Sequence, residues 1–108
     1  MPIRIIDNAV YSGRVGIGTN NPTSPLHIKV SGSGGSNIFS LENDSNKYDF
    51  RLNGSTLLIR DGSNDRVSVT SAGNVGIGTT SPNAKLEVKS NGSNIDEISL
   101  VHSGNTVK

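Results

Sequence analysis

GRVGIGTNNP at residues 13–22 and GNVGIGTTSP at residues 73–82 are two copies of one stretch, identical at seven of ten positions. The match continues at an offset of 60 residues without a gap, and the further matched pairs are Leu26 and Leu86, Ile28 and Val88, Lys29 and Lys89, Gly32 and Gly92, Ser33 and Ser93, and Ile38 and Ile98. Self-similarity held in register over this length predicts a repeat architecture. We therefore divide the chain into an N-terminal segment, 1–12, a first repeat, 13–72, and an incomplete second repeat, 73–108.

The composition favours an all-β chain that needs partners. Apolar residues make up 31% of the 108 residues, and the chain has no Cys. Leu, Ile, Val and Phe together number 28, with only three Ala, so β-branched residues that suit strands dominate. A chain this short of core residues usually requires disulfides, a metal or partner subunits. Because disulfides are impossible and the two His lie far apart, self-association is the expected route to stability.

Alternating apolar and polar residues predict short strands rather than helices. We expect strands over residues 26–30 and 86–88, a hairpin over residues 48–60 that turns at Asn53-Gly54, and a further turn over residues 61–64 before Val67 and Val69. Residues 31–36, SGSGGS, have the composition of a flexible linker. No window carries a helical apolar stripe. The predicted fold is therefore all-β, with little or no helix.

The glycines of the repeated stretch do not fit a nucleotide site. A dinucleotide fingerprint needs a third glycine at the start of a helix, but Asn21 and Ser81 occupy that place and a proline follows at once. We interpret the stretch as structural: its glycines allow close backbone approach, its Ile packs to one side, and its Thr and Pro form a turn into the next strand. The residues of this structural repeat motif are Val15, Gly16, Ile17, Gly18, Thr19 and Pro22, and Val75, Gly76, Ile77, Gly78, Thr79 and Pro82.

This motif resembles one that recurs in bacteriophage tail fibre and tailspike proteins, written G-x-V-G-I-G-T-x-x-P-x-x-x-L-x-V. Residues 73–88 fit every fixed position, and residues 13–28 depart once, with Ile28 in place of Val. The two stretches cover about a third of the chain. The resemblance implies an elongated, homotrimeric β structure located in the virion, in the phage tail, where it attaches to the tail and supports host recognition.

In such a fibre the N-terminal segment commonly attaches to tail or baseplate proteins. We therefore expect residues 1–12 to be the tail anchor, through the apolar side chains of Ile3, Ile5, Ile6 and Val10. Two other functions stay open: a bacterial or prophage-derived surface adhesin segment, and the non-catalytic stem of a polysaccharide-depolymerising tailspike. The recognition of a host receptor itself is expected beyond Lys108.

The sequence does not favour enzymatic function, and we expect neither a cofactor nor a metal. Asp61 and Asp65 flank a turn, where acidic residues are normally solvated or bonded to their own backbone. DGSND at residues 61–65 lacks the residue order of a calcium loop. His27 lies on the polar side of its strand. The net charge of +1 gives no basic field for nucleic acid, and no apolar run approaches the roughly 20 residues of a membrane span.

Overall fold

The computed structural model describes residues 13–90, 98, 100–102 and 105–107. All of its regular elements are strands, so the all-β prediction is confirmed for the described residues, which contain no helix. Contacts along the chain divide it into two compact units, residues 1–31 and 32–108. The boundary between the two sequence repeats falls within the second unit. The candidate anchor residues Ile3, Ile5, Ile6 and Val10 lie outside the described residues.

The described part of the first unit is a small parallel pair. Strand β1 (Val15–Ile17) is hydrogen-bonded to β2 (Leu26–Ile28), with Gly16 opposite His27. The strand predicted over residues 26–30 is confirmed as β2, two residues shorter, whereas the motif before it was expected to allow close backbone approach and to turn into that strand, not to form a strand of its own. The stretch in fact forms a strand as well, because Val15 and Ile17 alternate around Gly16 and pair with the strand after the loop. Pro22 lies in the loop between the two strands.

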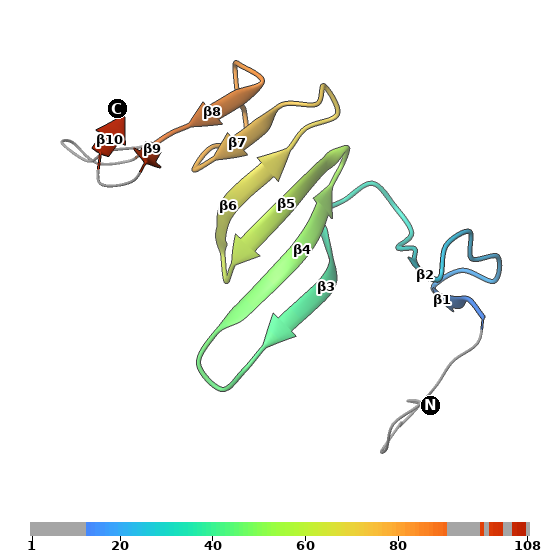
Figure 1. Cartoon of the computed structure of the whole chain (residues 1–108). Coiled ribbons are helices and arrows are strands. Elements are labelled where there is room, and N and C mark those ends of the chain that lie inside the picture. The colour runs from blue at the N-terminus through green and yellow to red at the C-terminus, as the bar shows by residue number, and fades with distance from the viewer. Residues whose placement is uncertain (1–12, 91–97, 99, 103–104, 108) are drawn as a thin grey trace. The chain divides into compact units, whose positions relative to one another are not determined.

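The described part of the second unit is dominated by one six-stranded sheet, whose strands lie side by side in sequence order (Figure 1). The strands are β3 (Ser36–Glu42), β4 (Lys47–Asn53), β5 (Thr56–Asp61), β6 (Asn64–Val69), β7 (Val75–Ile77) and β8 (Leu86–Val88). Strands β3 to β7 are antiparallel to their neighbours, and β7 and β8 are parallel. A separate antiparallel pair joins β9 (Leu100–His102) to β10 (Asn105–Val107).

The predicted hairpin over residues 48–60 is confirmed as β4 and β5, but its turn lies one residue later than expected. Asn53 is opposite Thr56, so the two turn residues are Gly54 and Ser55. Gly54 has a φ of 59°, the positive value that such two-residue turns require at the first position. Asn53 therefore remains in its strand. The predicted turn after β5 is confirmed: Asp61 is opposite Asn64, and Gly62 has a φ of 58°.

The SGSGGS segment leads directly into the sheet. Residues 31–35 form no strand, and Ser36 already belongs to β3. The backbone N–H of Gly54 donates a 3.1 Å hydrogen bond to the Ser33 carbonyl oxygen, which ties the segment to the β4–β5 turn. The guanidinium of Arg51 lies beside Gly35, so close that a Cβ there would meet it at 2.1 Å. The segment therefore packs against the sheet rather than hanging free of it.

Candidate assembly surface

One face of the six-stranded sheet is apolar from its first strand to its last. Residues opposite one another in neighbouring strands project to the same face, and alternate residues of a strand share a face. The register places the following side chains on one side, here called the apolar face: Phe39, Leu41, Tyr48, Phe50, Leu52, Leu57, Ile59, Val67, Val69, Val75, Ile77, Leu86 and Val88. It continues across all six strands, including the parallel pair β7 and β8.

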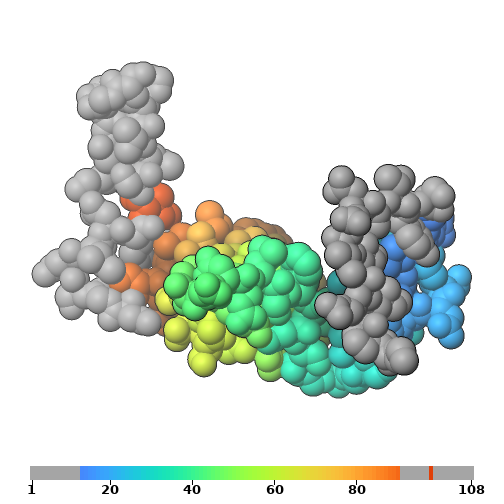
Figure 2. All heavy atoms as spheres, turned by 90° about the horizontal axis from the view of Figure 1, so that it is seen from below, coloured from blue at the N-terminus to red at the C-terminus, as the bar shows by residue number. Residues whose placement is uncertain are grey.

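This apolar face is uncovered by the other described residues of its own unit. Eight of its side chains are exposed, from 37% for Leu57 to 57% for Leu86, and the others are half-buried. Among the described residues the single buried apolar side chain is Leu58, which belongs to the opposite face. In Figure 2, the atoms of strands β3 to β7 form one continuous body, coloured green through yellow to orange. The sheet is thus a single layer with an apolar side open to a partner.

The face is ordered by contacts between its own strands. The rings of Phe39 and Phe50 lie opposite each other on β3 and β4, with centroids 5.9 Å apart and planes tilted by 52°. Aromatic pairs favour such tilted geometry. Next to them, Leu41 is opposite Tyr48 and Leu52 is opposite Leu57. Cross-strand pairs of this kind stabilise the sheet and hold a flat set of side chains in place for a partner.

The opposite face is polar and partly closed. The Asp49 carboxylate and the Ser68 hydroxyl are buried there, at 3% and 0% exposure. Ser40, opposite Asp49 on β3, donates a short hydrogen bond to the Asp49 Oδ1 atom, and the Lys47 Nζ atom lies 3.7 Å from the same oxygen. The buried carboxylate therefore has both a hydroxyl donor and a positive charge beside it.

The carboxylates that sequence analysis considered for catalysis are engaged in ion pairs. The Arg66 Nη2 atom lies 2.9 Å from the Asp61 Oδ2 atom. The Arg60 Nε and Asp65 Oδ1 atoms lie 2.6 Å apart but are not aligned as a hydrogen bond, so their attraction is chiefly electrostatic. Arg60 also donates to the Ser63 carbonyl oxygen across the turn, at 2.8 Å. These contacts fasten the β5–β6 turn, and they assign both carboxylates a structural role.

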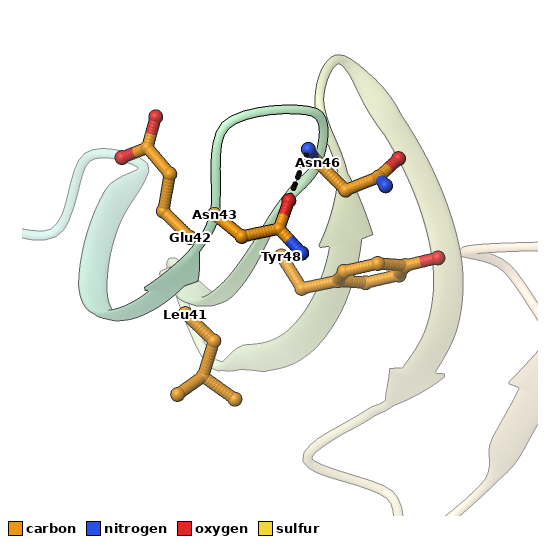
Figure 3. A pocket seen from close by; sticks show the side chains of 5 residues that line it. All are labelled: Leu41, Glu42, Asn43, Asn46 and Tyr48. Carbon is orange, nitrogen blue, oxygen red and sulfur yellow. Dashed lines mark hydrogen bonds between the residues drawn. The ribbon is translucent and has the colours of Figure 1, made fainter.

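A shallow hollow lies at the end of the apolar face, beside the β3–β4 turn (Figure 3). Its volume is about 440 Å³, and its lining residues are Leu41, Glu42, Asn43, Asn46 and Tyr48. The Asn43 Oδ1 atom accepts hydrogen bonds from the backbone N–H groups of Ser45, at 2.9 Å, and Asn46, at 2.8 Å. The Asn43 side chain thus builds the turn. Because Leu41 and Tyr48 belong to the apolar face, the hollow is continuous with that surface.

The two copies of the repeat motif have the same backbone geometry. Each forms a parallel pair closed by two hydrogen bonds of 2.8 Å at equivalent positions: Val15 N to Pro25 O and Lys29 N to Ile17 O in the first copy, Val75 N to Lys85 O and Lys89 N to Ile77 O in the second. In the loops, the hydroxyls of Thr19 and Thr79 each accept a 3.2 Å hydrogen bond from the backbone two residues on. Pro82, like Pro22, follows this turn within the loop.

The motif glycines are required within their own chain. Gly18 and Gly78 have φ values of 76° and 75°, and a Cβ at either would meet the carbonyl oxygen of Lys29 or Lys89 at about 2 Å. Gly76 faces the Thr79 carbonyl oxygen in the same way. For Gly18 and Gly78 the close approach lies between the loop and the residue just after the motif's second strand, and for Gly76 it lies between the first strand and the loop. The approach between chains expected from the sequence stays a prediction.

The middle residue of the motif's second strand supports the loop in each copy. The His27 Nδ1 atom accepts a 3.3 Å hydrogen bond from the Thr23 N–H, and the Glu87 Oε2 atom accepts one of 2.6 Å from the Asn83 N–H. The two side chains differ in chemistry but fill the same role. His27 therefore has a structural contact, which sequence analysis did not identify.

Comparison with protein-family models found no match for the chain, and comparison with curated proteins found none either. Within the described part of the chain, no cluster of three or more acidic, His or Cys side chains is arranged to hold a metal ion. No helix among these residues is long and apolar enough to cross a membrane.

Proposed function

We propose that the chain is a structural segment of a phage tail fibre, which assembles with copies of itself through the apolar face of strands β3 to β8. The observation that carries the proposal is the exposure of eight large apolar side chains on one side of a single-layer sheet. Complete burial of a fully exposed side chain of this size contributes about 1.5–3 kcal/mol, and each of these side chains still has 37–57% of its surface exposed. Monomeric soluble proteins rarely leave continuous apolar surfaces of this kind open.

A second copy of the same chain fits this surface chemically. Asp61, opposite Tyr48 at the end of β5, is the charged strand residue that the register places on the apolar side, and it is ion-paired with Arg66, while Lys47, Asp49, Arg51 and Arg60 belong to the other face. Two or three such faces meeting around an axis would exclude water without burying an unpaired charge. The resemblance of the repeat motif to fibre proteins favours three copies. In that arrangement the polar faces, with their ion pairs, are the outer surface of the fibre.

Attachment to the tail is the second part of the proposal. The N-terminal segment, with Ile3, Ile5, Ile6 and Val10, is the candidate contact with tail or baseplate proteins. Deletion of residues 2–10 is expected to leave the assembled fibre intact but to abolish its incorporation into virions. Full incorporation of the deleted chain would show that the anchor lies elsewhere.

The assembly is tested by the solution mass of the full chain, measured by light scattering with size exclusion. A mass near three times 11.3 kDa is expected. Leu57→Lys introduces a charge into the middle of the apolar face and is expected to shift the population to monomer. Asn53→Lys adds the same charge at an exposed position on the polar face of β4, opposite Thr56, and should leave the mass unchanged. A wild-type chain that is monomeric and unfolds cooperatively would contradict the proposal.

A further inference from the structure

The two copies of the repeat motif differ in what lies beside their first strand. Strand β7 lies between two neighbours, the parallel β8 and the antiparallel β6. On the β6 side, the Gly78 N–H donates a 3.0 Å hydrogen bond to the Arg66 carbonyl oxygen. The Ser68 hydroxyl donates a 2.8 Å hydrogen bond to the Thr79 carbonyl oxygen. The second copy of the motif is thus completed by a strand on each side.

Strand β1 has the same local structure but a neighbour on one side only, among the described residues. It pairs with β2 in a two-stranded sheet. A Cβ on Gly16 would meet the Thr19 carbonyl oxygen at 2.4 Å, and one on Gly76 would meet that of Thr79 at 2.3 Å, so the two carbonyls are held alike. Gly76 is buried opposite Ser68 of β6, whereas Gly16 is exposed. The edge of β1 therefore has the backbone shape that β7 shows beside β6, with no such strand on it among residues 13–90.

We propose that the edge of β1 that faces away from β2 is a strand-binding site for another polypeptide, which adds an antiparallel strand with an apolar–serine–apolar pattern. Strand addition to an open sheet edge gives affinity through main-chain hydrogen bonds and specificity through alternate side chains. A backbone carbonyl oxygen of the incoming strand accepts a hydrogen bond from the Gly18 N–H. The hydroxyl of the incoming serine donates a hydrogen bond to the Thr19 carbonyl oxygen. The two flanking apolar residues lie opposite Val15 and Ile17.

The motif itself explains why serine is preferred at the centre of the incoming strand. A Cβ on Gly76 would lie 2.7 Å from the Ser68 Oγ atom, so the missing side chain of the glycine makes room for that hydroxyl. Gly16 offers the same room beside β1. A larger central residue would collide with the β1 backbone and leave the Thr19 carbonyl without the hydroxyl donor that Thr79 has.

The chain's own preceding residues do not carry this pattern, which favours a partner over the chain itself. At the offset of 60, Asp7, Asn8 and Ala9 stand in place of Val67, Ser68 and Val69. An aspartate in the place of Val67 would bring a charge opposite Ile17, the equivalent of Ile77, and disfavour pairing. The expected partner is a strand with the character of β6, presented by a different polypeptide.

The test is titration of the full ¹⁵N-labelled chain with a synthetic peptide of residues 62–72, GSNDRVSVTSA, followed by amide chemical shifts and hydrogen exchange. The Gly18 amide is expected to shift and its exchange to slow, while the Gly78 amide, already bonded to Arg66, stays unchanged. Replacing the central serine of the peptide by alanine should weaken binding about 5-fold, the value of one hydrogen bond. Replacing the serine equivalent to Ser71 should leave binding unchanged.

Three results would overturn the proposal. The first is a Gly18 amide whose chemical shift and exchange rate stay unchanged up to the highest peptide concentration of the titration. The second is a shift of Gly78 alone, which would mean that the peptide displaces β6. The third is a Gly18 amide that is protected before peptide is added and loses protection when residues 2–10 are deleted, which would assign the edge to the chain's own segment. None of these readouts depends on the oligomeric state, so they are distinguishable from failure of the assembly proposal.

Discussion

Ser68 on β6 and Thr79 in the β7–β8 loop are joined by a 2.8 Å hydrogen bond, at a point where the serine side chain is completely buried. The bond holds the loop of the repeat motif against the polar face of the sheet. It thereby joins a strand of the first sequence repeat to the motif that opens the second. The loop occupies the polar side, and the apolar face on the other side is left open.

Ser68→Ala is expected to lower the free energy of unfolding by about 1–2 kcal/mol, because it leaves the carbonyl oxygen of the half-buried Thr79 without its donor. Denaturant unfolding at a fixed chain concentration measures the effect. Ser71→Ala, at an exposed turn position, is the matched control and should change stability by less than about 0.5 kcal/mol. Equal effects of the two substitutions would show that the buried hydrogen bond contributes nothing measurable.

Alanine substitutions of Gly78, Gly62 and Gly34 should lower the free energy of unfolding by three different amounts, because the three glycines differ in φ and in the space around them. Gly78→Ala is expected to cost more than about 2 kcal/mol, because its Cβ would meet the Lys89 carbonyl oxygen at 2.1 Å in addition to the strain of a positive φ. Gly62→Ala, with positive φ but open space, should cost about 1 kcal/mol. Gly34→Ala has neither problem and should be neutral. Thermal unfolding of the three variants gives the order, and a neutral Gly78→Ala would refute the close approach.

Asp49→Ala is expected to destabilise the sheet by about 1–3 kcal/mol, since it removes the acceptor of the Ser40 hydroxyl in a buried position. Asp49→Asn keeps an acceptor for Ser40 but loses the attraction to Lys47, so its effect should be smaller. Asp44→Ala, at an exposed position in the β3–β4 turn, serves as the control. If Asp49→Ala proved as harmless as Asp44→Ala in chemical denaturation, the buried carboxylate would have no structural role.

His27 and Glu87 are expected to be exchangeable. His27→Glu should preserve the hydrogen bond to the Thr23 N–H, whereas His27→Leu removes the acceptor and should speed the hydrogen exchange of that amide about 5-fold. The reciprocal variant Glu87→His, read at the Asn83 amide, is the control in the second copy. Fast exchange at Thr23 in the His27→Glu variant would mean that the two side chains do not fill the same role.

Much of the strand pattern could be read from the sequence, because alternation and turn residues act locally. Tyr48, Phe50 and Leu52 indicated their strand, and Gly54 and Gly62 marked the turns, with an error of one residue at the first. The parallel pairing within each motif could not be read, since three residues around a glycine are too few to show alternation. The pairing depends on a loop in which Gly18 or Gly78 packs against the carbonyl oxygen of Lys29 or Lys89. That contact forms only when the chain folds back on itself, so local sequence patterns do not show it.

The apolar face was only partly foreseeable. The shortage of core residues indicated a need for partners, but the sequence did not show that the alternate residues of six strands align on one side. That alignment depends on register, including the shifts between Asn37 and Phe39 and between Ile59 and Arg60. The role of Ser68 was also missed, because a serine between two valines looks like any outward position of a strand. Its burial follows from the loop that folds over it.

The parallel arrangement within each motif has a consequence for a chain under tension. In an antiparallel hairpin such as β4 and β5, pulling on the two ends opens the hydrogen bonds one after another, like a zip. In β1 and β2, or β7 and β8, the chain enters and leaves at opposite ends, so the same pull slides the two strands along each other. All the bonds that join the pair then bear the load together. Each motif is therefore built as a shear clamp, placed twice along the chain at an interval of 60 residues.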